Sequence, residues 1–463
     1  MNRVTASSPG PRNPRLLTVE QLSSQIGQGT IDTVIVAFTD MQGRLQGKRL
    51  HAPFFLDEVL GHNTEGCNYL LAVDVEMNTV PGYAISSWES GYGDMVFALD
   101  LDTIRLVPWL PATVMIQCDL TTMDGSPVAE SPRTILATQV AKAAEHGWTA
   151  YAGTELEFII FDDTYEAAWN ANYRDLTPAN QYNVDYSILG TTRVEPLLRD
   201  IRNSMYAAGM VVESAKGECN FGQHEIAFRF GEVTDAADDH VVYKNGAKEI
   251  AALHGQSLTF MSKFNEREGN SCHIHLSLRG TDGALVFEDP TTHSRTPLYE
   301  HFIAGILTTM AEFTLLYAPN INSYKRFADG SFAPTTVAWG LDNRTCSVRL
   351  VGHGPGARLE NRLPGGDVNP YLAIAGMLAG GMYGIEHELE LEPEQVGNAY
   401  TSGKPTVPRT LQAARDLFHG SAIARATLGD NVVDHYVHAA DTELAAFNAA
   451  VTDWELRRGF ERL

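Results

Sequence analysis

Hydrophobic and polar residues alternate with two different periods at the start of the chain. Leu22 and Ile26 lie one helical turn apart, which predicts a short helix over 18–26. The run 33–39 is apolar and β-branched and predicts a buried strand, and 44–50 is expected to return beside it. The pattern therefore predicts a helix followed by a β-hairpin.

Further alternating segments predict two domains. A strand pair over 94–108 completes a small β-rich domain, for which we predict the bounds 16–118. Over 119–463 strands and helices are mixed, which predicts an α+β catalytic domain. Its strands are expected at 154–161, 223–230, 272–279 and 345–351, and its helices at 133–145, 194–208, 234–264, 297–317, 368–387 and within 408–463.

The composition narrows the class of protein without identifying it. The 463 residues include 34 Lys and Arg against 57 Asp and Glu, which gives a net charge of −23, and 44% of them are hydrophobic. Such a chain folds around an apolar core, and its negative charge argues against nucleic acid as a partner. Five widely spaced cysteines indicate a reducing compartment, so we predict a cytoplasmic protein.

Two segments of the chain could be targeting or membrane elements by their position or composition: residues 1–15 and the apolar run 371–385. Residues 1–15 are rich in Ser, Pro and Arg and have no apolar centre, which predicts a disordered tail and not a signal peptide. The apolar run 371–385 is interrupted by glycines and is too short to span a bilayer. We therefore expect no membrane partner.

Two predicted strands carry pairs of carboxylates. Glu155 and Glu157 are two residues apart and share one strand face. Glu218 and Glu225 flank a glycine-containing loop that leads into the next strand. An exposed acidic face would explain each pair alone, but half-buried neighbouring carboxylates require a cation or a proton.

Two later strands place histidines and alternating charges on one face. His273 and His275 share a face, either as metal ligands or as hydrogen-bonded core residues. Arg358, Glu360 and Arg362 alternate in the same way, and a simple salt-bridge ladder is the alternative to a site. Together with the carboxylates, this oxygen-rich set with an imidazole favours Mg²⁺ or Mn²⁺ over structural zinc. Arginines beside such metals are typical of phosphoryl transfer.

Six motifs, in order, resemble those of the type I bacterial glutamine synthetase family: TELEF, ECNFGQHE, NSCHIHLSL, NSYKR, DNRTCSVR and ARLENRLPGGDVNPYLAIAGMLAG. The resemblance covers nearly all of 16–463. It implies a β-grasp N-terminal domain and a catalytic domain with an antiparallel sheet and surrounding helices. It also implies ATP, two or three divalent cations (Mg²⁺ or Mn²⁺), L-glutamate as substrate, and a homo-oligomer that is a dodecamer of two hexameric rings.

The resemblance also assigns roles to individual residues. One cation would be held by Glu157, Glu218 and Glu225, and the other by Glu155, His273 and Glu360. Glutamate would be held by Arg326 and Arg362, with Gly269 beside them. Catalysis would use Arg344, Arg349 and Phe332, and ATP would contact Glu213, His275, Ser277, Arg349 and Arg358.

The departures from the family pattern concern the amine. Phe332 stands where glutamine synthetases carry the flap Glu that helps to bind ammonium, and the second ammonium-binding Asp is also missing. The pattern is similar to that of γ-glutamyl-amine ligases, so we predict ethanolamine or a polyamine as the second substrate, with a preference for ethanolamine. The amine pocket is predicted to contain Phe332, Asp74, Glu76 and Tyr186.

Two alternatives remain open at this point. Asp74 or Glu76 could restore ammonium binding, which would make the chain a genuine glutamine synthetase. A catalytically silent regulatory paralogue is the other alternative, although all six predicted metal ligands are present. Tyr400 lies near the tyrosine that is adenylylated in some family members, but its flanking residues GNAYTSG differ from that site.

Overall fold

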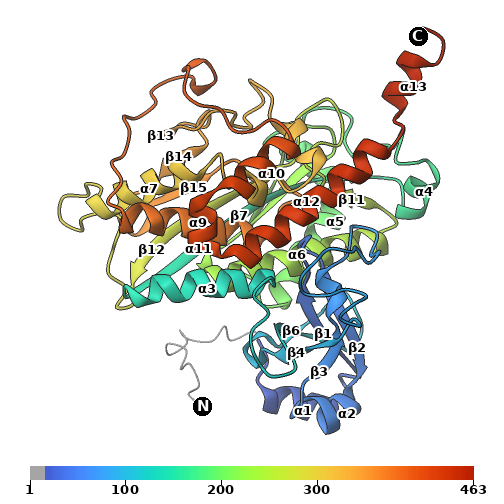
Figure 1. The fold of residues 1–463 in the computed structure, drawn as a ribbon. Coiled ribbons are helices and arrows are strands. Elements are labelled where there is room, and N and C mark those ends of the chain that lie inside the picture. The colour runs from blue at the N-terminus through green and yellow to red at the C-terminus, as the bar shows by residue number, and fades with distance from the viewer. Residues whose placement is uncertain (1–15) are drawn as a thin grey trace. The chain divides into compact units, whose positions relative to one another are not determined.

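The computed structural model describes residues 16–463, so the predicted tail lies outside the described residues. Figure 1 labels the helices and strands. The described chain divides into two compact units whose segments alternate along the sequence. The first unit takes in the chain up to Cys67, Gly93–Thr138 and Ala150–Phe260, and the second takes in Asn68–Tyr92, Gln139–Thr149 and Met261–Leu463. The division into domains at residue 118 stays a prediction.

The smaller sheet contains the N-terminal strands. Its order is β2-β1-β6-β4-β3, and β5 pairs with β6. These strands are β1 (Thr33–Thr39), β2 (Leu45–His51), β3 (Thr64–Cys67), β4 (Asp94–Leu99), β5 (Arg105–Leu106) and β6 (Thr113–Thr121). The predicted hairpin is β1–β2. Both strands predicted over 94–108 are present, but each pairs with β6 and not with the other.

Local side-chain contacts explain the start of the fold. The first helix, α1 (Val19–Gly27), begins at the N-cap Thr18 with a capping box, and Leu22 and Ile26 are buried as predicted. In the β1–β2 turn the buried Asp40 carboxylate accepts hydrogen bonds from the backbone N–H groups of Gln42 and Arg44. These contacts fix the turn that the sequence predicts.

The larger sheet carries most of the candidate site. Its order is β13-β14-β15-β12-β7-β9-β8, and β10 and β11 pair with β7. Its strands are β7 (Trp148–Phe161), β8 (Val212–Gly217), β9 (Gln223–Phe228), β10 (Gly231–Glu232), β11 (Ser257–Thr259), β12 (Cys272–Gly280), β13 (Trp339–Leu341), β14 (Val348–Val351) and β15 (Arg358–Asn361). The α+β class is confirmed. The β13–β14 pair is parallel, so the sheet is not antiparallel throughout.

The remaining helices follow the predicted positions in part. They are α2 (Ala52–Phe54), α3 (Pro132–Glu145), α4 (Tyr165–Asn170), α5 (Ile188–Ala207), α6 (Val233–Leu253), α7 (Pro297–Thr309), α8 (Thr314–Tyr317), α9 (Pro370–Glu386), α10 (Leu411–Gly420), α11 (Ala422–Leu428), α12 (Asp430–Ala449) and α13 (Asp453–Gly459). Helices α2 and α4 were not predicted, and α5 begins six residues before the predicted start at 194. The helix predicted over 234–264 is wrong beyond Leu253, because Gly255 adopts a φ of 70° and the chain continues into β11. The helix predicted over 297–317 is divided into α7 and α8.

The apolar run 371–385 forms the buried helix α9, which packs against α7 (Figure 1). A Cβ atom on Gly305 would lie 2.6 Å from the backbone nitrogen of Gly384, so the two helices approach each other at glycine. Among residues 16–463, no helix has the length and apolar character needed to cross a membrane. The glycines in this run therefore serve close helix packing.

His435 on α12 makes stability depend on pH. Its buried ring lies 4.7 Å from that of Tyr83, and burial lowers its pKa to about 3. An unfolded histidine titrates near 6.5, so the unfolded state binds the extra proton between these values. The free energy of unfolding should therefore fall as pH drops from 6.5 towards 3, by at most about 1.4 kcal/mol per pH unit from this group.

Urea unfolding at pH 5, 6 and 7 tests this expectation. The free energy of unfolding of the His435→Gln variant should depend less on pH than that of the wild type. Loss of ring packing lowers stability equally at each pH, so only the slope is informative. Equal slopes in the wild type and the variant would contradict the assignment.

Candidate active site

Three carboxylates gather around strands β7, β8 and β9. Glu157 on β7 pairs in register with Glu225 on β9, and Glu218 lies in the turn between β8 and β9. Each offers one oxygen, and the three oxygens lie within 4.8 Å of one another. Gln223 Nε2 donates to Glu157 Oε2 at 3.0 Å and so orients this carboxylate. The structure thus brings together one complete predicted set of metal ligands.

The carboxylate cluster Glu157–Glu218–Glu225 carries an excess of buried negative charge. Burial raises the pKa of Glu218, and it raises the pKa of Glu225 well above the ordinary value. Lys216 on β8 lies opposite Glu225 in register and forms an ion pair with Glu218. Burial alone would lower the pKa of Lys216, but Glu225 and Glu218 raise it instead. One lysine offsets part of the charge, and an oxygen-binding divalent cation fits the remaining carboxylates.

Lys216 is a residue that sequence analysis missed. Its ammonium nitrogen lies 4.9 Å from the ring centroid of Tyr186, a predicted member of the amine pocket that is 71% exposed. Lys216 precedes Glu218 by only two residues, and the two side chains form an ion pair. This spacing was the available signal.

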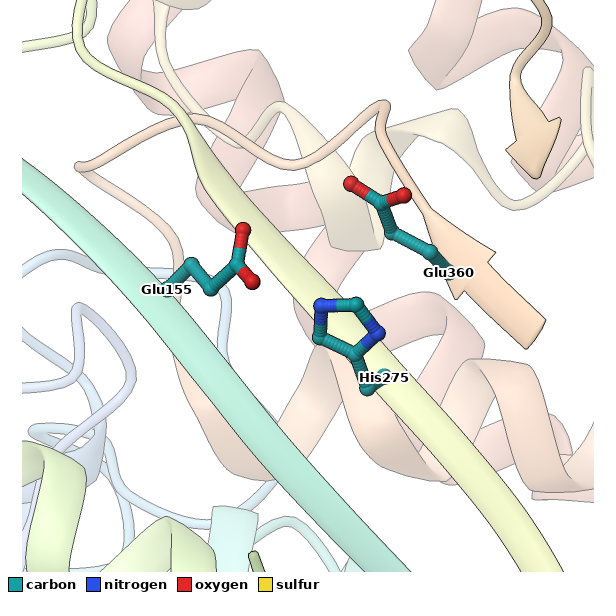
Figure 2. Close-up of side chains that lie close together, drawn as sticks. All are labelled: Glu155, His275 and Glu360. Carbon is teal, nitrogen blue, oxygen red and sulfur yellow. The ribbon is translucent and has the colours of Figure 1, made fainter. Parts of the chain in front are cut away.

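A second group lies on strands β12 and β15. His275 pairs in register with Glu360, and His273 Nδ1 lies 3.5 Å from Glu360 Oε1. Figure 2 shows Glu155, His275 and Glu360, whose possible ligand atoms lie within 4.8 Å of one another. The predicted ligand set contains His273 in place of His275. Because both imidazoles approach Glu360, the choice of His273 stays a prediction.

Arginines surround the fully buried Glu360. Arg349 Nη1 donates to Glu360 Oε2 at 2.9 Å, and the Arg362 guanidinium donates to Oε1. Arg358 Nε lies 3.1 Å from His275 Nδ1 and orients that imidazole. Arg349 Nε also donates to Asp342 Oδ1 at 3.0 Å. The sequence analysis did not select Asp342. Of the predicted Arg-Glu-Arg alternation, only Arg362 pairs with Glu360, and Arg349 from β14 completes this ion-pair network in place of Arg358.

Arg326 is fixed beside this network. It lies in the 3₁₀ helix η4 (Ile321–Arg326) and is 2% exposed. Its Nη1 donates to Ser271 Oγ at 3.2 Å, and its Nη2 donates to the Pro364 carbonyl at 2.9 Å. A Cβ atom on Gly269 would lie 2.8 Å from Arg326 Cγ, so only glycine allows this close approach. Arg326 and Gly269 are neighbours, as the prediction for a glutamate site requires.

A cavity of about 740 Å³ opens next to the arginines, and Arg349 and Arg358 line it together with Glu288, Tyr299 and His353. Four other predicted residues do not line it: Arg344, Glu213, His275 and Ser277. Arg344 is exposed in the loop before β14, and Glu213 is exposed on β8. The predicted nucleotide residues are therefore only partly gathered here.

The predicted amine-pocket residues lie in different surroundings. Phe332 is 58% exposed and has a φ of 58°. Asp74 accepts hydrogen bonds from the backbone N–H and side-chain amide of Asn78 at 2.8 and 2.9 Å. Glu76 is exposed, and Tyr186 faces Lys216. The assignment of these four residues to one pocket stays a prediction.

Comparisons with known proteins agree with this chemistry. The family model described as glutamine synthetase, catalytic domain, matches residues 129–459. The gamma-glutamylethanolamide synthetase GlnA4 of Streptomyces coelicolor is 63% identical over 447 residues, which cover 96% of each chain. A glutamate–isopropylamine ligase of a Pseudomonas species is 37% identical over 440 residues, which cover 94% of this chain and 96% of that protein.

A solved structure described as a GmaS/ADP complex is similar in fold. Its TM-score is 0.83 at 25% sequence identity, and the match covers 95% of this chain and 99% of that chain. A GmaS structure without ligand gives a TM-score of 0.81 at the same identity. The likeness therefore extends over both the N-terminal strands and the larger sheet.

Proposed function

The chain belongs to the glutamine synthetase family, and from this premise we propose that it is an ATP-dependent ligase that joins an amine to L-glutamate. The observation that carries the proposal is the 63% identity, over 96% of both chains, to a protein named gamma-glutamylethanolamide synthetase. The flap residue Phe332 supports the same reading, since glutamine synthetases have a glutamate there. We propose ethanolamine as the amine, with a polyamine as the second candidate.

The reaction has two steps. The γ-carboxylate of glutamate attacks the γ-phosphorus of ATP, which gives γ-glutamyl phosphate and ADP. The amine nitrogen then attacks the activated carbonyl carbon, inorganic phosphate leaves, and the nitrogen loses a proton. The carboxylates and imidazole proposed as ligands would hold divalent cations, which would supply positive charge near the phosphoryl oxygens.

The residues of this chain supply binding and charge. We propose that Arg326 and Arg362 bind the carboxylates of glutamate, since fixed guanidinium groups recognise carboxylates well. Arg349 and Arg358 line the cavity of about 740 Å³, and we propose that they face the phosphates of ATP. Arg344 is proposed to act on the acyl phosphate, and Glu213, His275 and Ser277 to contact the nucleotide.

Six residues are proposed as ligands of two cations, in the sets Glu157, Glu218 and Glu225, and Glu155, His273 and Glu360. The donor chemistry of both sets suits Mg²⁺ or Mn²⁺. The dodecamer of two hexameric rings and the cytoplasmic location remain predictions. Light scattering after size-exclusion chromatography measures the molar mass of the oligomer.

A panel of amines tests the proposed function. Phosphate release is measured with glutamate, ATP and Mg²⁺ in the presence of ethanolamine, isopropylamine, putrescine, spermine or ammonium. We expect the highest kcat/KM with ethanolamine. Isopropylamine is the matched probe, because its branched alkyl group lacks the hydroxyl that ethanolamine offers. Highest turnover with ammonium would identify a glutamine synthetase, and no turnover with any amine would favour the silent paralogue.

We expect the Phe332→Glu variant to shift the amine preference of the enzyme from ethanolamine towards ammonium. A carboxylate at this position should attract ammonium, so the ratio of kcat/KM for ammonium to that for ethanolamine should rise about tenfold. Phe332→Leu removes the ring without adding charge, and Phe230→Glu adds charge at another exposed phenylalanine. Neither control should favour ammonium. An unchanged ratio in Phe332→Glu would contradict the flap argument.

A further inference from the structure

The loop that carries Phe332 is held by a distant segment of the chain. We define the Phe332 loop as residues 327–335 and the clasp segment as 395–409. The Tyr400 hydroxyl donates to the Ala333 carbonyl at 3.0 Å, and Arg409 Nη1 donates to the Phe327 carbonyl at 2.7 Å. Backbone hydrogen bonds continue the contact, because Val407 N–H donates to the Thr335 carbonyl at 3.1 Å. The clasp segment therefore holds both ends of the Phe332 loop.

The apex of this loop has an unfavourable backbone. Phe332 has a φ of 58°, a left-handed conformation that bulky residues seldom adopt. Its side chain is 58% exposed, so packing of the ring contributes little to holding this conformation. The bond from Tyr400 reaches the very next residue, Ala333. Of the clasp contacts, it lies nearest in sequence to the strained position.

The clasp segment also reaches the loop that carries Arg344. The Ala399 backbone N–H donates to Thr345 Oγ1 at 2.9 Å, and Asn343 Nδ2 donates to the Gly397 carbonyl at 2.8 Å. Arg344 lies between Asn343 and Thr345 in the sequence. One segment therefore contacts the proposed amine loop and the proposed acyl-phosphate loop.

The charges of the proposed glutamate site act on the pKa of the Tyr400 hydroxyl. Burial raises the pKa of this hydroxyl, while the charges of Arg362 and Arg326 act in the opposite direction.

We infer that Tyr400 is a positioning residue for amine selection, whose hydroxyl holds the backbone of the Phe332 loop so that the Phe332 ring borders the amine pocket. This inference rests on the proposed function. Tyr400 itself contacts neither the amine nor the transferred phosphoryl group in this account. Without the hydroxyl, the loop populates other conformations and the amine is bound less well.

The Tyr400→Phe variant removes only the hydroxyl. Loss of one neutral hydrogen bond should raise the KM for ethanolamine about fivefold. The KM values for ATP and glutamate should change less than about twofold, because the Tyr400 hydroxyl donates to the Ala333 carbonyl and not to a residue proposed to bind either substrate. Tyr165→Phe is the matched control, since the Tyr165 hydroxyl donates to the Leu258 carbonyl at the same distance of 3.0 Å. This control should leave all three KM values unchanged.

A second readout does not require activity. Chymotrypsin cleaves after exposed phenylalanine, so cleavage after Phe332, identified by mass spectrometry, should be faster in Tyr400→Phe than in the wild type and in Tyr165→Phe. Faster cleavage together with a selective rise in the amine KM supports the inference. Unchanged cleavage, or an equal rise of all three KM values, overturns it. Wild-type enzyme that uses no organic amine would instead refute the proposed function, while the cleavage comparison would still test the clasp.

Discussion

Replacing Glu360 by alanine is expected to lower kcat/KM about a thousandfold and to destabilise the fold. The Glu360 carboxylate is fully buried and accepts hydrogen bonds from Arg349 and Arg362. Removing one partner of a buried charge network leaves the other charges uncompensated, which costs about 3–5 kcal/mol. The two arginines would also lose the geometry with which we propose that they face substrate charge, and such preorganised contacts contribute strongly to catalysis.

Two further variants separate these effects. Glu360→Gln keeps the shape and some hydrogen bonding, so it should restore much of the stability but little of the activity. Glu195→Ala removes an exposed partner of Arg202 and should change stability by less than about 1 kcal/mol. Activity close to wild type in Glu360→Gln would contradict a role for this carboxylate in the reaction. Chemical denaturation and steady-state kinetics supply both measurements.

Replacing Glu157 by alanine is expected to weaken binding of a divalent cation about a hundredfold or more. Glu157, Glu218 and Glu225 offer oxygens within 4.8 Å of one another, so each should supply one ligand. Mn²⁺ should raise the melting temperature of the wild type, because a cation that binds only the folded state stabilises it. The variant should show little such shift and little ATP turnover.

The control for this prediction is Asp185→Ala. Asp185 is exposed and forms a different candidate group with Glu218 and Cys219. If the carboxylate cluster Glu157–Glu218–Glu225 is the cation site, Asp185→Ala should keep the Mn²⁺-dependent thermal shift. If the Mn²⁺-dependent thermal shift were lost in Asp185→Ala and kept in Glu157→Ala, the cation site would instead be the group Asp185, Glu218 and Cys219.

Strand periodicity predicted much of the candidate site. Glu157 was selected because it shares a strand face with Glu155, and Glu225 was selected because it follows a loop that begins after Glu218. In the structure Glu157 and Glu225 are paired neighbours on β7 and β9. The motifs around His273, Glu360 and Arg362 likewise lie on strands that pair with one another. Short-range rules succeeded here because the side chains project directly from regular strands.

Long-range pairing was not predictable from these patterns. The strands within 94–108 were expected to pair with each other, but their partner β6 lies farther along the chain. The helix α6 ends earlier than its apolar pattern suggests, since Gly255 turns the chain at a single residue. Lys216 and Asp342 were missed because their roles depend on charge partners that are apparent only in three dimensions.

The most direct test of the account is a competition between amines. The wild-type enzyme is incubated with glutamate, ATP and Mg²⁺ together with equal concentrations of ethanolamine and ammonium, and both products are quantified by mass spectrometry. We expect γ-glutamylethanolamide to form in large excess over glutamine, because we propose that Phe332 stands in place of the carboxylate that helps to bind ammonium in glutamine synthetases. Glutamine as the main product would contradict it.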